Sequence, residues 1–380
     1  MNRIIKKAFP ENIKAPLRKI RGVYRGTLAA YKKYAVPKFL IHFVTTRCQL
    51  NCKHCFCPSE SDASSKDKLS LSELKKVILS FNAPIDTVVL TGGEPFLHKD
   101  LVEMALLYNS LNKARIISIN TNGYATDTIV NSVNKILNDL DNNSCLSLQV
   151  SLDGPERIHN DIRGNPYSFQ NAAETIRRLK KIQVANDKMH IHTLCIINQK
   201  NCNYLKELSS YCMENLNMPI YFELVRRNIC DFHSVEYKPR DGLTGDLSFD
   251  LKRAFNDIVH IYNQQDKRFK SKSCSSMIGK IRDEFTIARE GKRLFACMAG
   301  NYAGALFSNG DVSPCELLDF RLNLRDFDYN FPKIWNSPRM RAVVEKIRRS
   351  CFCTLGCFVG LSRQRIDYQL KTLFAKPKFL

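Results

Sequence analysis

The sequence lacks the long apolar runs of membrane-spanning or secreted chains. No stretch of its 380 residues approaches the roughly 20 uninterrupted apolar residues that a transmembrane helix needs. Residues 1–16 are broken by lysines, Pro10 and Glu11 before the apolar core of a signal peptide can form. We therefore expect a cytoplasmic chain whose 15 cysteines are thiols and not disulfides.

Acidic residues are few, and they are scarcest near the two ends. The chain has 58 lysines and arginines against 37 aspartates and glutamates, a formal net charge of +21. Ahead of the first predicted strand Glu11 is the single acid, and residues 23–31 add an apolar side. Such ends attract phosphates or the inner face of a membrane, but a solvated face that keeps the protein soluble is the simpler alternative. The basic residues of the far end are Arg339, Arg341, Arg348, Arg349, Lys371, Lys376 and Lys378.

Alternating apolar runs and helical periods predict the fold class. The predicted strands are residues 39–44, 86–90, 114–119, 146–152, 190–197 and 220–225, and the predicted helices are residues 74–81, 98–111, 128–140, 169–181 and 204–214. This alternation predicts an α/β fold, a partial (β/α)6 TIM-like barrel. Its ligand groups are expected on the loops at the carboxyl ends of the strands.

Three cysteines lie close together after the first predicted strand. Cys48, Cys52 and Cys55 are separated by three and two residues. Three thiols on one loop suit a soft metal or an iron–sulfur cluster, and three ligands on a four-iron cluster leave one iron open to bind a substrate. The spacing alone also allows a zinc site.

A glycine-rich turn follows the second predicted strand. Gly92 and Gly93 allow the backbone to approach a ligand closely, and Glu94 comes directly after them. The alternative is a turn with a solvated glutamate.

Together these motifs resemble those of the radical S-adenosylmethionine enzymes. The cysteine loop, with His54 before and Phe56 after its third cysteine, is similar to that family's cluster loop, and residues 92–94 look like its methionine-binding motif. The resemblance implies a partial barrel with a [4Fe–4S] cluster on the three cysteines. It also implies reductive cleavage of S-adenosylmethionine to a 5′-deoxyadenosyl radical that abstracts a hydrogen atom from the substrate, with flavodoxin or ferredoxin as electron donor.

The resemblance extends to residues that would contact the cofactor. The backbone of residues 92–94 and the Glu94 carboxylate would hold its amino group. The ends of the third and fourth predicted strands are similar to the family's corresponding strands, which implies contacts from Asn120, Ser151 and Arg163. Structural capping is the alternative for each of these three, and Asp153 either closes a turn or contacts the substrate.

A second cysteine constellation lies towards the other end of the chain. Residues 309–312 form the turn of a predicted β-hairpin between its first two cysteines. The glycine five positions before Cys315 and residues 334–338 make this region resemble the SPASM extension of radical S-adenosylmethionine enzymes, which carries auxiliary clusters. The members of the constellation are Cys297, Cys315, Cys351, Cys353 and Cys357.

Full SPASM domains have seven cysteines and two clusters, so five cysteines indicate the shortened form called twitch, with one [4Fe–4S] cluster. Cys353 and Cys357 match the interval of the larger domain's final pair. We therefore favour these two with Cys297 and Cys315 as ligands, and Cys351 as the alternative ligand. A zinc knuckle is the competing interpretation.

The predicted reaction is oxidation or crosslinking, with the second cluster as electron acceptor. One alternative is a redox-neutral epimerase or rearrangement enzyme acting on a sugar or peptide, in which Cys195 or Cys230 returns a hydrogen atom. A different alternative is a zinc-thiolate nucleic-acid-binding protein. The substrate is a small molecule, a sugar- or lipid-linked intermediate or a peptide. The roughly 40 residues ahead of the first strand disfavour leader-guided peptide modification, because an independent domain needs about 50.

The length of the chain allows one large core with a small appended module. The predicted division is a basic extension over residues 1–37, the barrel core over 38–245, a connecting helical segment over 246–296, an auxiliary-cluster domain over 297–360 and a basic tail over 361–380.

Overall fold

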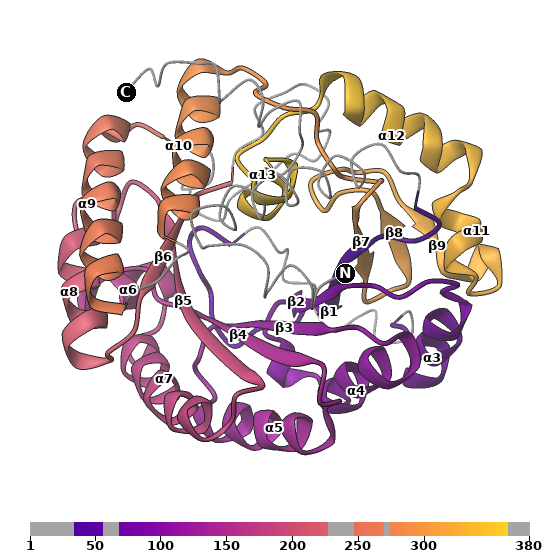
Figure 1. The fold of residues 1–380 in the computed structure, drawn as a ribbon, viewed down its shortest axis with the longest axis horizontal. Helices are drawn as coiled ribbons and strands as arrows, with labels where there is room; N and C mark the ends of the chain where they lie inside the picture. Colours follow the sequence, from indigo (N-terminus) through magenta and orange to yellow (C-terminus); the bar gives the residue numbers. More distant parts are fainter. Residues whose placement is uncertain (1–33, 56–67, 227–246, 270–273, 364–380) are drawn as a thin grey trace, which may run out of the picture.

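The computed structural model describes residues 34–55, 68–226, 247–269 and 274–363 (Figure 1). Phe56, Cys230, most of the basic extension and most of the basic tail lie outside these residues. No helix within the described part of the chain is long and apolar enough to cross a membrane.

One sheet organises the described residues, with the strand order β6-β5-β4-β3-β2-β1-β7-β8-β9. Its first six strands are β1 (Phe39–Thr45), β2 (Thr87–Gly92), β3 (Ile116–Thr121), β4 (Cys145–Ser151), β5 (Met189–Ile197) and β6 (Ile220–Leu224). Each pairs in parallel with the next. The sheet curves around a central space but does not close, since β6 and β9 stand at opposite ends of the order (Figure 1). The predicted α/β partial barrel is confirmed.

Helices cover the outer face of this curved sheet (Figure 1). They are α3 (Leu71–Ser80), α4 (Leu101–Asn112), α5 (Thr126–Asp139), α6 (Glu156–Arg163), α7 (Ser168–Ala185) and α8 (Leu205–Asn215). The start of α3 shows how sequence sets a boundary, because Ser70 and Glu73 form a reciprocal capping box. Leu74, Val77 and Ile78 then recur at helical spacing and are buried.

Two helices protect the edge of the sheet at β6. They are α9 (Leu251–Phe269) and α10 (Cys274–Glu290). The Phe222 N–H donates to the Tyr262 hydroxyl at 2.9 Å, and the Leu224 N–H donates to Glu284 Oε2 at 3.2 Å. These side chains satisfy backbone donors that an edge strand would otherwise present to another chain.

The predicted hairpin near the C-terminal end is present and continues the same sheet. It comprises β7 (Ala303–Phe307) and β8 (Asp311–Ser313), which pair antiparallel, and β8 pairs with the short β9 (Leu322–Asn323). Gly310 has a φ of +89° in the turn, a conformation that favours glycine. β7 pairs in parallel with β1, so the C-terminal segment is attached to the strand that leads into the first cysteine loop.

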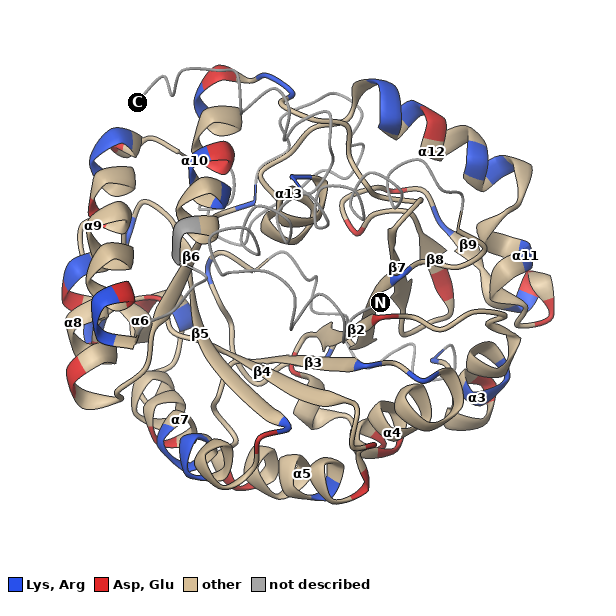
Figure 2. Ribbon diagram, viewed as in Figure 1, with Lys and Arg blue, Asp and Glu red and all other residues tan. Residues whose placement is uncertain are grey.

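Three helices complete the described fold: α11 (Phe331–Trp335), α12 (Pro338–Ser350) and α13 (Gly356–Ser362). The outer surface of α12 is strongly basic (Figure 2). Its charged residues are Arg339, Arg341, Glu345, Lys346, Arg348 and Arg349. The predicted attraction of this end to phosphates or a membrane stays a prediction.

Candidate active site

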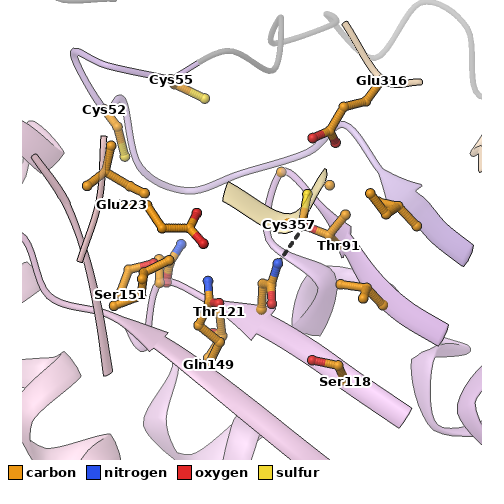
Figure 3. A pocket seen from close by; sticks show the side chains of 18 of the residues that line it. Cys52, Cys55, Thr91, Ser118, Thr121, Gln149, Ser151, Glu223, Glu316 and Cys357 are labelled. Carbon is orange, nitrogen blue, oxygen red and sulfur yellow. Dashed lines mark hydrogen bonds between the residues drawn. The ribbon is translucent and has the colours of Figure 1, made fainter. Parts of the chain in front are cut away.

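A cavity of about 370 Å³ runs along the inner face of the curved sheet and reaches the carboxyl ends of its parallel strands (Figure 3). Its wall includes the cysteine loop, residues from β1 to β6, and Glu316 and Cys357 from the C-terminal segment. Ligand pockets in proteins span roughly 300–1,000 Å³, so this cavity has the size of a small-molecule site.

The cysteine loop delivers all three of its thiols to the cavity. Cys48 is exposed, Cys52 is buried and Cys55 is half-buried, and each lines the wall. The loop is held by the end of α6, because the Lys53 N–H donates to the Ile162 carbonyl at 2.8 Å. Gly164 ends α6 with φ +66°, and a Cβ there would lie 2.9 Å from the Asn51 carbonyl oxygen.

Hydrogen-bond donors surround the sulfurs of this loop. The Leu50 N–H donates to Cys48 Sγ at 3.5 Å, and Asn122 Nδ2 donates to the same sulfur at 3.6 Å. Arg163 Nη1 donates to Cys52 Sγ at 3.6 Å. Donors to the ligand sulfurs are one means by which proteins tune iron–sulfur clusters, so the residues present fit such a group.

Burial opposes bare thiolates at these positions. Although Cys48 is exposed as a whole residue, partial desolvation of its thiol in the cavity wall raises its pKa to about 11. Burial also raises the pKa of Cys52, although the Arg163 guanidinium partly offsets the effect. A thiol in such surroundings stays deprotonated when a cationic metal centre compensates its charge.

The spacing of side chains bears on the zinc alternative. Among the described residues, no three or more His, Cys, Asp or Glu side chains converge closely enough to hold one metal ion. A single zinc needs its ligands at about 2.0–2.3 Å from one point, whereas a cubane cluster spreads its thiolates over separate irons.

Gly92 and Gly93 bring the end of β2 against the start of the cysteine loop. A Cβ at Gly92 would lie 2.1 Å from the Thr45 carbonyl oxygen, and one at Gly93 would lie 2.2 Å from that of Arg47. The Gly93 N–H donates to the Thr45 carbonyl at 2.8 Å. Both glycines also line the cavity, so their lack of side chains serves loop packing as well as access to a ligand.

The Glu94 side chain is directed away from the cavity and into the fold. It is 1% exposed and does not line the cavity wall. Its carboxylate accepts hydrogen bonds from the Thr121 hydroxyl at 2.8 Å, the Asn122 N–H at 2.8 Å and the Phe96 N–H at 3.3 Å. Burial raises the pKa of Glu94 to about 7. In this structure Glu94 fixes the end of β3, and its predicted contact with the cofactor's amino group stays a prediction.

The other predicted cofactor contacts reach the cavity wall. Asn120 from β3, Ser151 from β4 and Arg163 from α6 all line it. Asn120 Nδ2 donates to the Thr91 hydroxyl at 3.4 Å, which orients the amide. The structure therefore brings these three side chains together with the cysteine loop.

Asp153 is a positioning residue for Arg163. Its side chain is fully buried, and Oδ2 lies 2.6 Å from Arg163 Nη2, whose side chain is 8% exposed. Oδ1 accepts the Ile196 N–H at 3.0 Å. Burial would raise the pKa of Asp153, but the Arg163 charge, together with His54, His159 and the Ile196 N–H, outweighs burial and holds the pKa below its ordinary value. Asp153 itself does not line the cavity, so its predicted alternative as a direct substrate contact has no support here.

One part of the cavity wall is charged. Glu316 Oε1 lies 3.1 Å from Arg226 Nη1, and both residues line the cavity. Glu223 at the end of β6 pairs with Lys280 of α10, which also lies 3.4 Å from Glu284. Figure 3 shows Glu223 and Glu316 around the same space as Cys52. Three acidic side chains (Glu223, Glu284 and Glu316) and two cations (Arg226 and Lys280) therefore lie at or next to this part of the wall.

Cys195 does not reach the cavity. It is fully buried in the core, and its neighbours Leu194 and Ile196 line the wall in its place. Asn201 Nδ2 donates to its sulfur at 3.5 Å. The predicted hydrogen-donor position is thus unsupported for Cys195, while Cys230 lies outside the described residues.

The five C-terminal cysteines gather in and around one apolar cluster. Cys315, Cys351 and Cys353 are buried in it, and Cys297 and Cys357 pack against it. Cys357 is the one among them that lines the cavity. Membership of this apolar cluster does not by itself select which four of the five cysteines are the predicted ligands.

Sequence reasoning missed several residues of the wall. Glu223 and Arg226 sit at the end of β6, so the strand-end rule that selected Asn120 and Ser151 could have found them. Glu316 carries no comparable signal, because it comes from the C-terminal segment and reaches the cavity through the pairing of β7 with β1.

Comparisons with known proteins agree with this geometry. Residues 43–208 match the family model of the Radical SAM superfamily. The AdoMet-dependent heme synthase of Oleidesulfovibrio alaskensis is 29% identical over 178 residues, which is 46% of this chain and 41% of that protein. The antilisterial bacteriocin subtilosin biosynthesis protein AlbA of Bacillus subtilis is 23% identical over 325 residues, 82% of this chain and 62% of that protein. The matches thus span less than two thirds of these relatives' length.

Solved structures show the same fold. Streptococcus suis SuiB bound to S-adenosylmethionine has a TM-score of 0.58 at 15% identity, covering 90% of this chain and 75% of that one. The structure of anSMEcpe with bound AdoMet has a TM-score of 0.57 at 16% identity, covering 83% and 84%. SuiB has also been solved bound to the precursor peptide SuiA. Residues 43–208 are therefore similar to the radical SAM domain, and the described residues share the partial-barrel fold of these structures.

Proposed function

We propose that this protein is a radical SAM enzyme that binds a [4Fe–4S] cluster on Cys48, Cys52 and Cys55 and cleaves S-adenosylmethionine reductively. The observation that carries the proposal is the delivery of three thiols from one loop to a cavity of about 370 Å³, with hydrogen-bond donors aimed at two of the sulfurs. The match of residues 43–208 to the radical SAM family model supports it.

The protein's own residues position the reactants. When bound, the cluster supplies the electron that cleaves the cofactor to methionine and a 5′-deoxyadenosyl radical. Asn120, Ser151 and Arg163 offer polar groups to the cofactor's ribose and carboxylate, and Gly92 and Gly93 give it access to the backbone. Asp153 holds the Arg163 guanidinium in place, which matters because a reactive group misplaced by about 1 Å is costly.

The substrate enters between the cysteine loop and the charged wall. The bacteriocin biosynthesis relative and the peptide-bound SuiB structure favour a peptide among the three predicted substrate classes. The C-terminal cysteines would hold a second [4Fe–4S] cluster, which would supply an acceptor for the electron left after a hydrogen atom is abstracted from the substrate. With release of a proton, this would give oxidation or crosslinking. Epimerisation is the alternative outcome, and a flavodoxin or ferredoxin supplies the low-potential electron.

The proposal is tested with protein purified and reconstituted without oxygen. Reduced wild-type protein should convert S-adenosylmethionine to 5′-deoxyadenosine, measured by liquid chromatography. Cys52→Ala should abolish this product. The matched control is Cys145→Ala, which changes a half-buried cysteine at the opposite end of β4 and should leave the product unchanged. No cleavage by reduced, iron-replete wild type would refute the proposal.

The reaction outcome needs a labelled substrate. Deuterium on the carbon that is attacked should appear in 5′-deoxyadenosine, and the product's mass should fall by two hydrogens for oxidation or crosslinking. An unchanged product mass with inverted stereochemistry would select epimerisation instead. A colourless protein that binds nucleic acid with steep salt dependence would favour the zinc-thiolate alternative.

A further inference from the structure

The C-terminal segment offers five thiols to a centre that needs four, so one of them is available for another role. The choice among them rests on the second cluster of the proposed function. Spacing selected Cys353 and Cys357 and set Cys351 aside. The structure distinguishes the five by what each thiol contacts.

Four of the thiols lie near one another in the apolar cluster. Cys351 hydrogen-bonds Cys297, and Cys315 lies within electrostatic range of both Cys297 and Cys353. Cys315, Cys351 and Cys353 are each less than 8% exposed, and none of the four lines the cavity. Thiols that close on one another within an apolar cluster have the surroundings of buried cluster ligands.

The backbone explains why Cys351 and Cys353 point the same way. The chain leaves α12 in an extended conformation, with φ −75° and ψ 138° at Cys351, and no regular element covers residues 351–355. Side chains two residues apart in an extended segment lie on the same face. Cys351 and Cys353 therefore face the same side despite the short interval between them.

Cys357 has different surroundings. It is the second residue of α13, and its charged neighbours are Glu316, Arg226, Glu223 and Lys280. A Cβ added at Gly356 would lie 2.3 Å from Glu223 Cδ, so the first turn of α13 packs directly on the end of β6. Figure 3 shows Cys357 with Glu223 and Glu316 around the cavity.

We infer that Cys297, Cys315, Cys351 and Cys353 are the ligands of the C-terminal cluster, and that Cys357 is a substrate-facing thiol of the active-site cavity. The same cavity holds the first cysteine loop, so Cys357 lies within the space shared by cofactor and substrate. This assignment reverses the predicted roles of Cys351 and Cys357.

Iron content separates the two assignments without a known substrate. Wild-type protein reconstituted without oxygen should hold about eight irons in two clusters. Cys351→Ala should lose iron from the second site or give one of its irons an altered Mössbauer signal, because that iron loses its thiolate ligand, and Cys297→Ala should do the same. Cys357→Ser should keep about eight and retain both cluster signals in Mössbauer spectra. Thermal unfolding of each variant checks that the fold is intact.

The opposite pattern would overturn the inference. Iron loss or an altered cluster signal in Cys357→Ser at an unchanged melting temperature would make Cys357 a ligand, and full iron retention with both cluster signals unchanged in Cys351→Ala would remove Cys351 from the set. A wild-type protein with only about four irons would refute the second cluster itself, and not the cavity position of Cys357.

A footprint tests that position independently. Methyl methanethiosulfonate should modify Cys357 in the reconstituted wild type, and saturating S-adenosylmethionine should slow this several-fold, as mapped by peptide mass spectrometry. Cys145 is the control thiol, because it does not line the cavity and its rate should not change. Equal rates at Cys357 with and without S-adenosylmethionine would count against a cavity-facing thiol.

Discussion

Replacing Asp153 with asparagine should destabilise the protein far more than a typical charge removal. Asp153 is fully buried and is the carboxylate paired with Arg163 at 2.6 Å. Asp153→Asn keeps the shape but leaves a buried guanidinium without its counter-charge. Removing one partner of a buried ion pair costs about 3–5 kcal/mol, so the free energy of unfolding should fall by that amount.

A matched control lies eight residues along the chain, on α6. Asp161 pairs with Lys53 and Lys200, but its side chain is 45% exposed. Exposed pairs contribute about 0.2–1 kcal/mol each, so Asp161→Asn, which removes two of them, should lower the free energy of unfolding by less than about 2 kcal/mol. Both variants remove one carboxylate charge, and burial is the difference between them.

Urea unfolding followed by circular dichroism measures the effect. The loss at Asp153→Asn should be larger in iron-free protein than in reconstituted protein, because the Cys52 sulfur, 3.6 Å from Arg163 Nη1, compensates the cation as a cluster-bound thiolate. Adding Arg163→Met to Asp153→Asn should recover much of the stability, since it removes the uncompensated charge. Similar losses for Asp153→Asn and Asp161→Asn, or no recovery in the double variant, would refute the reasoning.

Three further changes have defined outcomes. The pKa of Glu94 is raised from 4.5 to about 7 in the folded protein, so its contribution to stability is full below pH 4.5 and is lost as the pH rises to 7; that loss is on the order of 3 kcal/mol. Glu94→Gln should flatten this part of the profile in urea titrations at several pH values, and an unchanged slope would assign it to another group. Gly92→Ala places a Cβ 2.1 Å from the Thr45 carbonyl oxygen at a φ of +142°; it should reduce iron binding at the first cluster and cost more than about 1 kcal/mol, and iron retention at wild-type stability would contradict this. Trp335→Ala empties a fully buried site where the indole packs over Gly304, and should cost about 3–5 kcal/mol, measured by denaturant unfolding against the milder Trp335→Phe.

The sequence predicts the sheet well because each strand is followed by a helix whose apolar residues recur at a clear period. The strand predicted at residues 39–44 is observed as β1, which is one residue longer. The helix predicted at residues 74–81 begins three residues earlier, at Leu71, because Ser70 and Glu73 form its cap. The helix α6 was missed as an element. Its eight residues place only Ile158 and Ile162 at helical spacing, a weak periodic signal in a polar segment.

The site could be predicted only where chemistry and position coincide. Cys48, Cys52 and Cys55 have a diagnostic spacing, and Asn120 and Ser151 follow from the strand-end rule. The engagement of Glu94 by Thr121 and Asn122 could not be predicted, because it depends on where β3 ends relative to the turn after β2. The positions of Glu316 and Cys357 depend on a parallel pairing between β1 and β7 across about 260 residues, which local patterns do not encode.

The long-range pairing of β7 with β1 couples the structures of the two cysteine-bearing regions. β1 is hydrogen-bonded on one side to β2 and on the other, over five registered residue pairs, to β7. Truncating the chain ahead of β7 would leave one edge of β1 without a hydrogen-bonding partner along its length. Such an open edge is a template for strand addition by another chain. A shift of one residue in the register of β1 and β7 would turn the side chains of Leu40 and Ile41 to the wrong faces of the sheet. It would also displace both cysteine-bearing regions. The C-terminal segment is thus a structural part of the partial barrel. A chain that lacks it should aggregate before its enzymatic activity could be measured.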